Sequence, residues 1–147
     1  MRRAILPLCI LLLFAPRAAA QAYYFAIPEA EVTVTIQQDG SALIHYELTF
    51  TCMEGAHPID IVDIGMPNLA MHQALSATID GESIDPSAIR ISSVLEPEGS
   101  GYEIELAGKR IPEGSTGVFT FTGRETGMVW QDTTDPEQAS FRFTPTW

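Results

Sequence analysis

The sequence predicts an all-β fold: an antiparallel β-sandwich, immunoglobulin-like or jelly-roll-like, of roughly seven to nine strands, preceded by a signal-peptide helix. Many short segments alternate apolar and polar side chains with a period of two, as half-buried strands do. Pro, Gly, Asp or Ser bounds each segment at close spacing, which is typical of sandwiches and open barrels. No helical period runs long enough to compete with these strands.

A signal peptide is predicted ahead of the domain. Arg2 and Arg3 precede an apolar run over residues 5–14, and the alanines at 18–20 supply the small-residue pattern that signal peptidase reads. A membrane-spanning helix needs about 20 apolar residues, and Pro16 ends this run too early. We therefore expect cleavage after the last alanine and a location that is secreted, periplasmic or on the cell surface.

Residues 21–147 are expected to form a single extracytoplasmic domain, because their number supports one core. The whole chain has a net charge of −11, and residues 1–20 hold three of its eight basic side chains and no acid. The processed domain is therefore more acidic still, and its field repels nucleic acid and anionic lipid headgroups. We expect no nucleic-acid partner, and contact with a membrane only through an anchor beyond residue 147.

The first hairpin is the clearest local signal. Residues 31–37 and 42–52 both alternate polar and apolar side chains. The pair Asp39-Gly40 suggests a two-residue type I′ turn, but that turn would mix the polar and apolar faces of the two strands. A loop of three residues sets Val34 opposite Ile44 instead, with the glycine in the left-handed position of a G1 bulge. The three-residue loop is our prediction.

Shorter strands are predicted along the rest of the chain. Each of these segments alternates polar and apolar side chains and is bounded by turn residues. One further segment, residues 69–74, is compatible with a helical turn. The predicted strands cover residues 59–64 (ending at Gly65), 75–79 (before the turn Asp80-Gly81), 88–95, 102–106, 118–122, 128–131 and 140–144.

Two pairs of side chains have a spacing that catalysis could use. His45 and Glu47 share the polar face of one strand, and a histidine beside a carboxylate can act as an acid–base pair where a cleft surrounds both. Cys52 and His57 could form a nucleophile pair if the sulfur were exposed. Alternation places Cys52 on the apolar face, so we expect a buried thiol. It is also the one cysteine after residue 20, which excludes an internal disulfide.

Other acidic residues and histidines are candidates for a zinc site, a calcium site or a glycosidase site, but none of them forms a specific motif. We therefore assign no catalytic, cofactor-binding or metal-binding residue. Zinc sites use paired ligands at close spacing, which these candidates lack: Cys52, His57, His72, Asp60 and Asp63. Calcium prefers clustered carboxylates in loops, where the candidates are Asp60, Asp63, Asp132 and Asp135. A glycosidase needs two carboxyls about 5–10 Å apart across a sugar cleft, and the candidates are Glu96, Glu98, Glu103 and Glu105.

Aromatic residues near both ends of the domain are candidates for contacts. Tyr23, Tyr24 and Phe25 either form a binding segment or begin the first strand and cover a sheet edge. Trp130 and Trp147 could contact a partner or a further part of the chain. The nucleophile elbow, the P-loop, the HExxH zinc motif and the dinucleotide fingerprint are all absent from the sequence, which counts against the common enzyme classes.

Residues 139–147 form a predicted strand that runs into the terminal tryptophan, whereas chain ends are usually polar and frayed. The segment Val32–Thr51, the run Val62–Asn68 and the ending Phe143–Trp147 resemble the exported N-terminal β-domain of an uncharacterised family of bacterial predicted membrane proteins. The resemblance implies a longer parent protein with its anchor further on, and it brings no known catalytic residues. We expect the domain to be truncated at its C-terminus.

The sequence favours a non-enzymatic interaction or structural module of the bacterial cell envelope. Export, strand alternation and the missing catalytic motifs support this expectation. Two alternatives stay open. One is a hydrolase of envelope polymers that uses surface carboxylates such as Glu47, or His45; the other is a subunit that assembles by strand exchange through an open sheet edge.

Overall fold

The computed structural model describes residues 22–67, 72–92 and 100–145, and over these ranges the protein is an all-β, antiparallel, sandwich-like fold, as the alternation predicts. The described ranges contain ten strands, more than the roughly seven to nine expected, because several strands span only two or three residues and are too short for alternation to reveal. In chain order they are β1 (Phe25–Ile36), β2 (Ala42–Cys52), β3 (Ile61–Met66), β4 (His72–Ile79), β5 (Glu82–Ser83), β6 (Ile89–Ile91), β7 (Ser100–Glu105), β8 (Thr116–Glu125), β9 (Val129–Gln131) and β10 (Ala139–Phe141).

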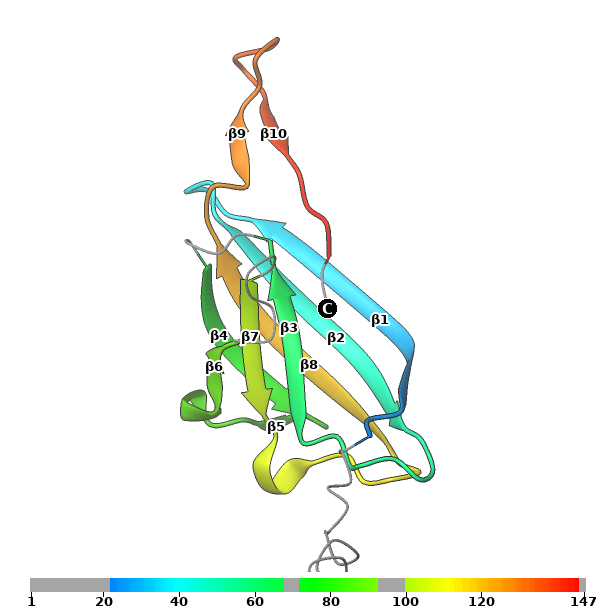
Figure 1. Ribbon diagram of the computed structural model, residues 1–147. Coiled ribbons are helices and arrows are strands. Elements are labelled where there is room, and N and C mark those ends of the chain that lie inside the picture. The colour runs from blue at the N-terminus through cyan, green and yellow to red at the C-terminus, as the bar shows by residue number, and fades with distance from the viewer. Residues whose placement is uncertain (1–21, 68–71, 93–99, 146–147) are drawn as a thin grey trace, which may run out of the picture.

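Two sheets pack face to face (Figure 1). The large sheet has the strand order β1-β2-β8-β4-β5, and the small sheet has the order β3-β7-β6. The β9-β10 hairpin projects beyond one end of the sandwich. In the described ranges the helical segments are two short 3-10 turns, Pro86–Ala88 and Ala107–Lys109, and no helix there could cross a membrane. The predicted signal peptide lies outside these ranges.

The core lies between the two sheets and is centred on β2 and β8. All six inward-facing side chains of β2, from Ala42 to Cys52, are buried, and Phe119 and Phe121 of β8 pack beside them without exposure. The small sheet covers this layer with Val62, Ile64, Tyr102 and Ile104. The buried position of Cys52 agrees with the prediction from its strand parity.

The predicted register of the first hairpin is confirmed. Val34 pairs with Ile44, and the backbone N–H of Gln37 donates to the carbonyl of Ser41 at 2.7 Å, which leaves a three-residue loop. Gly40 has φ of 77°, the left-handed conformation that this loop requires. One consistent apolar face therefore sets the register, as parity predicts.

The first strand begins at Phe25, as one interpretation of the aromatic residues at 23–25 predicted, although its alternation is clear only from residue 31. Pro28 does not stop it, since a proline is tolerated in an edge strand, and the register shifts between Ala26 and Glu29 on either side of it. Residues 25–30 alternate poorly but still pair with β2. Backbone pairing with β2, rather than the side-chain pattern, therefore extends the strand to Phe25.

The helical turn expected at 69–74 is wrong over residues 72–74, which belong to β4; residues 69–71 lie outside the described ranges. His72 and Gln73 pair with the end of β8, and the long partner strand outweighs a weak local preference. The strand expected at 88–95 begins one residue later, as β6, because residue 88 ends a 3-10 turn that Asp85 caps. β6 ends at Ile91, and residues 93–95 lie outside the described ranges. The strand expected to end at Gly65 continues to Met66.

Candidate functional site

On one side of the sandwich both sheets end in an edge strand, β1 in the large sheet and β3 in the small sheet (Figure 1). Three strands do not cover five, so the inner face of β1 is only partly shielded. Val32 and Val34 are half-buried there, although their cross-strand partners Tyr46 and Ile44 are completely buried. Phe143, in the segment that follows β10, is also half-buried and packs against the core. Apolar surface therefore remains partly accessible beside two strand edges.

A groove of about 470 Å³ occupies one end of this side, and we call it the edge groove. Phe25 and Ile61, one on each wall, are 51% and 41% exposed. Most of the lining is apolar, with two carboxylates on the small-sheet wall. Its residues are Tyr23, Phe25, Ile27, Phe50, Ile59, Ile61, Val62, Asp63 and Glu103.

The aromatic wall of the edge groove is held in place by ring contacts. The rings of Phe25 and Phe50 lie 5.7 Å apart with an edge-to-face tilt of 61°, and Phe50 contacts Phe119 of the core in the same manner. Tyr23 donates a hydrogen bond from its hydroxyl to Asp60 at 2.8 Å, and this bond raises the pKa of the tyrosine. The segment before β1 is thus tied to the start of β3.

The opposite wall carries two carboxylates that face the same side of the small sheet. Asp63 and Glu103 occupy directly opposite positions on β3 and β7, and both are half-buried. The hydroxyl of Ser92 donates to Asp63 at 2.5 Å, which fixes that side chain. Arg90, opposite Glu103 on β6, forms its ion pair with Glu105 instead, at 2.9 Å. Like charges placed directly opposite repel each other, so a cation is favoured at this wall.

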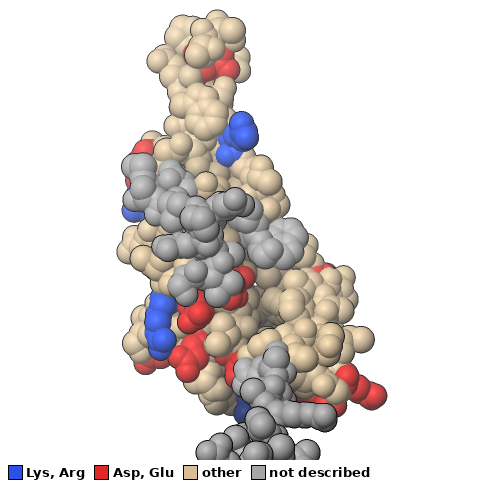
Figure 2. All heavy atoms as spheres, in the orientation of Figure 1, with Lys and Arg blue, Asp and Glu red and all other residues tan. Residues whose placement is uncertain are grey.

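Acidic side chains gather on the face of the molecule where the small sheet lies (Figure 2). The ion pairs within the described ranges use Glu105, Glu82 and Asp39, and none of them uses Asp63 or Glu103. The negative charge on the groove wall is therefore not compensated by an ion pair in this part of the chain.

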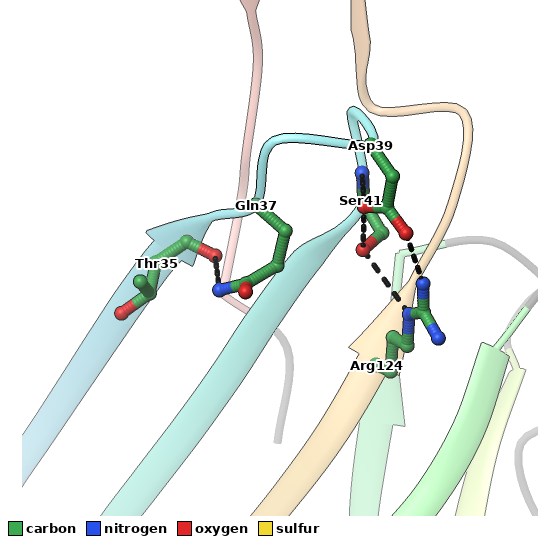
Figure 3. A network of polar contacts seen from close by, with 5 residues as sticks. All are labelled: Thr35, Gln37, Asp39, Ser41 and Arg124. Atoms are coloured by element: carbon green, nitrogen blue, oxygen red, sulfur yellow. Dashed lines mark hydrogen bonds and ion pairs between the residues drawn. The ribbon is translucent and has the colours of Figure 1, made fainter.

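A second hollow, of about 720 Å³, lies near the β1–β2 loop, and its polar groups already bind one another. Asp39 accepts hydrogen bonds from the hydroxyl of Ser41 at 2.7 Å and from its N–H at 3.0 Å, and it forms an ion pair with Arg124 (Figure 3). These bonds from Ser41, with a smaller contribution from Arg124, lower the pKa of Asp39. Gln37 donates from its side chain to the carbonyl of Thr35. This network stabilises the loop.

The His45 and Glu47 pair lies on the outer face of the large sheet, away from the edge groove. The Nδ1 atom of His45 is 2.8 Å from the hydroxyl of Thr122. Glu47 is exposed, and its partner across the sheet is Thr120. The neighbours of both residues on β8 are therefore hydroxyls, and their neighbours on β1 are Thr33 and Glu31. Two exposed carboxylates, Glu31 and Glu47, thus lie directly opposite each other on this face, with no cleft around them among the pockets described.

Cys52 and His57 do not form a thiolate–imidazole pair. The buried thiol of Cys52 donates to the backbone carbonyl of His57 at 3.4 Å, and the imidazole Nδ1 lies 2.8 Å from the carbonyl of Pro58. In residues 22–67, 72–92 and 100–145, no three His, Cys, Asp or Glu side chains come together as a metal site would require. The structure thus does not bring the scattered metal candidates together in these ranges.

The remaining candidates serve local structure or lie outside the described residues. Asp132 accepts hydrogen bonds from the hydroxyl and N–H of Thr134 and from Ser140, and these bonds lower its pKa strongly. Asp135 accepts from Glu137 and Gln138 in the same hairpin loop. Trp130 is exposed on β9. Glu96, Glu98 and Trp147 lie outside the described ranges.

Sequence reasoning missed the edge groove as a unit, although it proposed that Tyr23 to Phe25 cover a sheet edge. The usable signal was Ile61 beside Val62, since consecutive apolar residues place one side chain on each face of a strand. Val62 is buried and Ile61 is exposed. Contiguous exposed apolar side chains indicate a contact surface, and Ile61 lines one groove with the exposed Phe25.

The fold is similar to part of the native structure of yeast LTA4 hydrolase, with a TM-score of 0.50 and 17% identity over 84% of this chain and 19% of that one. A second similar structure is an M1 zinc metallopeptidase from Deinococcus radiodurans, with a TM-score of 0.47, 16% identity, and coverage of 76% of this chain and 22% of that one. This chain spans about a fifth of the length of each. No family model and no curated protein sequence matches it. At this identity the first similarity shows the β fold alone.

Proposed function

We propose that the protein is a non-enzymatic interaction module of the bacterial cell envelope, exported from the cytoplasm, and that the edge groove is its binding surface. The observation that carries the proposal is the exposure of Phe25 and Ile61 on the two walls of one apolar groove. Soluble proteins rarely leave contiguous apolar surface beside open strand edges unless a partner covers it.

The carboxylates of the groove favour binding over hydrolysis. Glycoside hydrolysis uses two carboxyls on either side of a sugar, one as acid and one as base or nucleophile. Asp63 and Glu103 are cross-strand neighbours on the same wall, and Asp63 is already fixed by Ser92. Glu47, the other carboxylate considered for hydrolysis, lies on the open outer face of the large sheet.

A second candidate function is assembly of identical subunits through their strand edges. The length of β1 favours it, since this edge strand has 12 residues and a largely exposed burial pattern. Long edge strands are templates for pairing with another chain. In this case the module would bind a copy of itself rather than a different protein.

Site-specific photo-cross-linking in the cells that express the protein tests the proposal. A benzoylphenylalanine at position 25 or 61 is expected to give a discrete cross-linked partner outside the cytoplasm. The matched control is position 118, where Val118 is 36% exposed on the outer face of the large sheet. Equal labelling at all three positions, or none at 25 and 61, would contradict the proposal; a cross-link to a second copy alone would favour assembly.

A further inference from the structure

We propose that the edge groove binds an extended segment of a partner protein, which adds as a strand to β3 and alternates aliphatic with basic side chains. The inference rests on the proposed function and names the class of partner. Its three supports are the backbone groups of Ile61 and Asp63 at the edge of β3, which no strand of the described ranges pairs on the groove side, the apolar floor of the groove and the carboxylates on the groove wall.

The backbone of β3 offers hydrogen bonds on the groove side. The N–H of Leu106 donates to the carbonyl of Asp60 at 2.7 Å, so positions 60, 62 and 64 direct their backbone groups toward β7. By the same alternation, Ile61 and Asp63 direct theirs toward the groove side, where β3 is the sheet edge. The carbonyl of Gly65, further along, accepts a hydrogen bond from Tyr46. The available edge is therefore at positions 61 and 63.

The apolar lining of the edge groove determines which side chains are preferred on the inward face of an added strand. A strand paired with β3 would direct every second side chain inward, on the same side as Val62 and next to Phe25 and Phe50. Phe25 remains half exposed, so covering it removes apolar surface from water. Aliphatic side chains fit this position best, because a charged group would lose its hydration there.

The carboxylates of Asp63 and Glu103 determine which side chains are preferred on the outward face of an added strand. The residue opposite Asp63 on an added strand would lie on the outer face, beside Asp63 and the directly opposed Glu103. Neither acid is in an ion pair within the described ranges. A Lys or Arg at this position would relieve their mutual repulsion, and the net charge of −11 would attract a basic segment from a distance.

The test uses the processed protein, produced by expressing the full chain so that the predicted signal peptide is removed during export. Fluorescein-labelled peptides are titrated with this protein, and binding is followed by fluorescence anisotropy. The probe is Gly-Val-Lys-Val-Lys-Val-Gly-amide with fluorescein on its N-terminal amine, and its matched control carries Glu in place of Lys. Saturable binding of the Lys peptide is expected, with affinity for the Glu peptide at least about tenfold weaker. N-methylation of alternate backbone amides is expected to abolish binding, because it removes the strand hydrogen bonds.

Variants locate the peptide on the protein. Glu103→Gln is expected to weaken binding of the Lys peptide several-fold, and Asp63→Asn, which keeps an acceptor for Ser92, provides a second charge-removing variant. Glu47→Gln, on the outer face of the large sheet, is the matched control and is expected to leave affinity unchanged. Equal binding of both peptides, or loss of affinity in Glu47→Gln alone, would overturn the inference.

The outcome separates this inference from the proposed function. Failure of every peptide to bind, with cross-links from positions 25 and 61 intact, would overturn the partner class while the interaction module stands. Self-association in light scattering that Ile61→Lys abolishes, without peptide binding, would also overturn it, because the occupant would then be a second copy. Peptide binding without cross-links in cells would support the chemistry of the groove and contradict its use there.

Discussion

Glu125 of β8 lies directly opposite His72 of β4, and the side chain of Glu125 is completely buried. Both of its carboxyl oxygens are buried, and among the described residues the neighbouring group that favours their charged form is the backbone N–H of Thr126. Burial raises the pKa of Glu125 to about 7, and the adjacent N–H of Thr126 offsets only part of this effect. The pKa of Tyr102 is also raised, chiefly by its own burial and further by the charge of Glu125. The sandwich thus holds a carboxyl group that is neutral in mild acid.

The stability of the fold is expected to fall as the pH rises from about 4.5 to about 7. The carboxyl of Glu125 ionises near 4.5 in the unfolded chain and near 7 in the fold, so the folded state binds more protons in this window and loses that advantage as the pH increases. The loss amounts to at most about 3 kcal/mol. Urea midpoints measured at about pH 5 and about pH 8 provide the measurement.

The variant Glu125→Gln separates this effect from other titrations. Its side chain is similar in shape and carries no charge, so it is expected to be more stable than the parent protein at about pH 8 and to lose most of the decline. Glu47→Gln removes an exposed carboxyl on the same sheet and should keep the decline. An unchanged pH dependence in Glu125→Gln would show that another group is responsible.

The first hairpin supports a second prediction, on the loop glycine. Gly40→Ala is expected to destabilise the protein by about 1–2 kcal/mol, because φ is 77° there and an L side chain strains this conformation, although nothing lies within 4 Å of an added Cβ. Gly108→Ala is the control, since Gly108 also has open space and no positive φ. Thermal unfolding of both variants should show a loss for Gly40→Ala alone.

This hairpin also shows why part of the fold is predictable from sequence. Strict alternation on both strands leaves one register that buries a single face, so Val34 opposite Ile44 follows from parity alone. His72 gives no such signal, because its place in β4 depends on the end of β8, more than 50 residues later. The edge groove depends on which strands end up at sheet edges, and local patterns do not encode sheet order. Glu125 was missed because the predicted strand ended at residue 122, whereas β8 continues to Glu125.

Close packing around β8 leads to a third prediction, on two of its glycines. A Cβ at Gly117 would lie 2.9 Å from Cγ1 of Ile111 and 3.3 Å from Cδ1 of Ile79, and branched side chains have few ways to move. A Cβ at Gly123 would lie 2.7 Å from the terminal methyl of Met66, which is flexible, and 3.1 Å from Cε1 of Phe121. Gly117→Ala should therefore cost about 1–3 kcal/mol and Gly123→Ala less, as measured by urea unfolding. The reverse order would contradict this account.

The last prediction concerns the thiol of Cys52. It is completely buried and hydrogen-bonded to the carbonyl of His57, so the processed protein should not react with a bulky disulfide reagent such as DTNB until it unfolds. One thiol per chain should then appear in denaturant, because the other cysteine, Cys9, lies in the predicted signal peptide. Rapid labelling of the native protein would show that the sulfur is accessible. The hypothesis that Cys52 and His57 form a nucleophile pair would then have to be reconsidered. Reaction that follows the unfolding curve instead places Cys52 in the cooperative core.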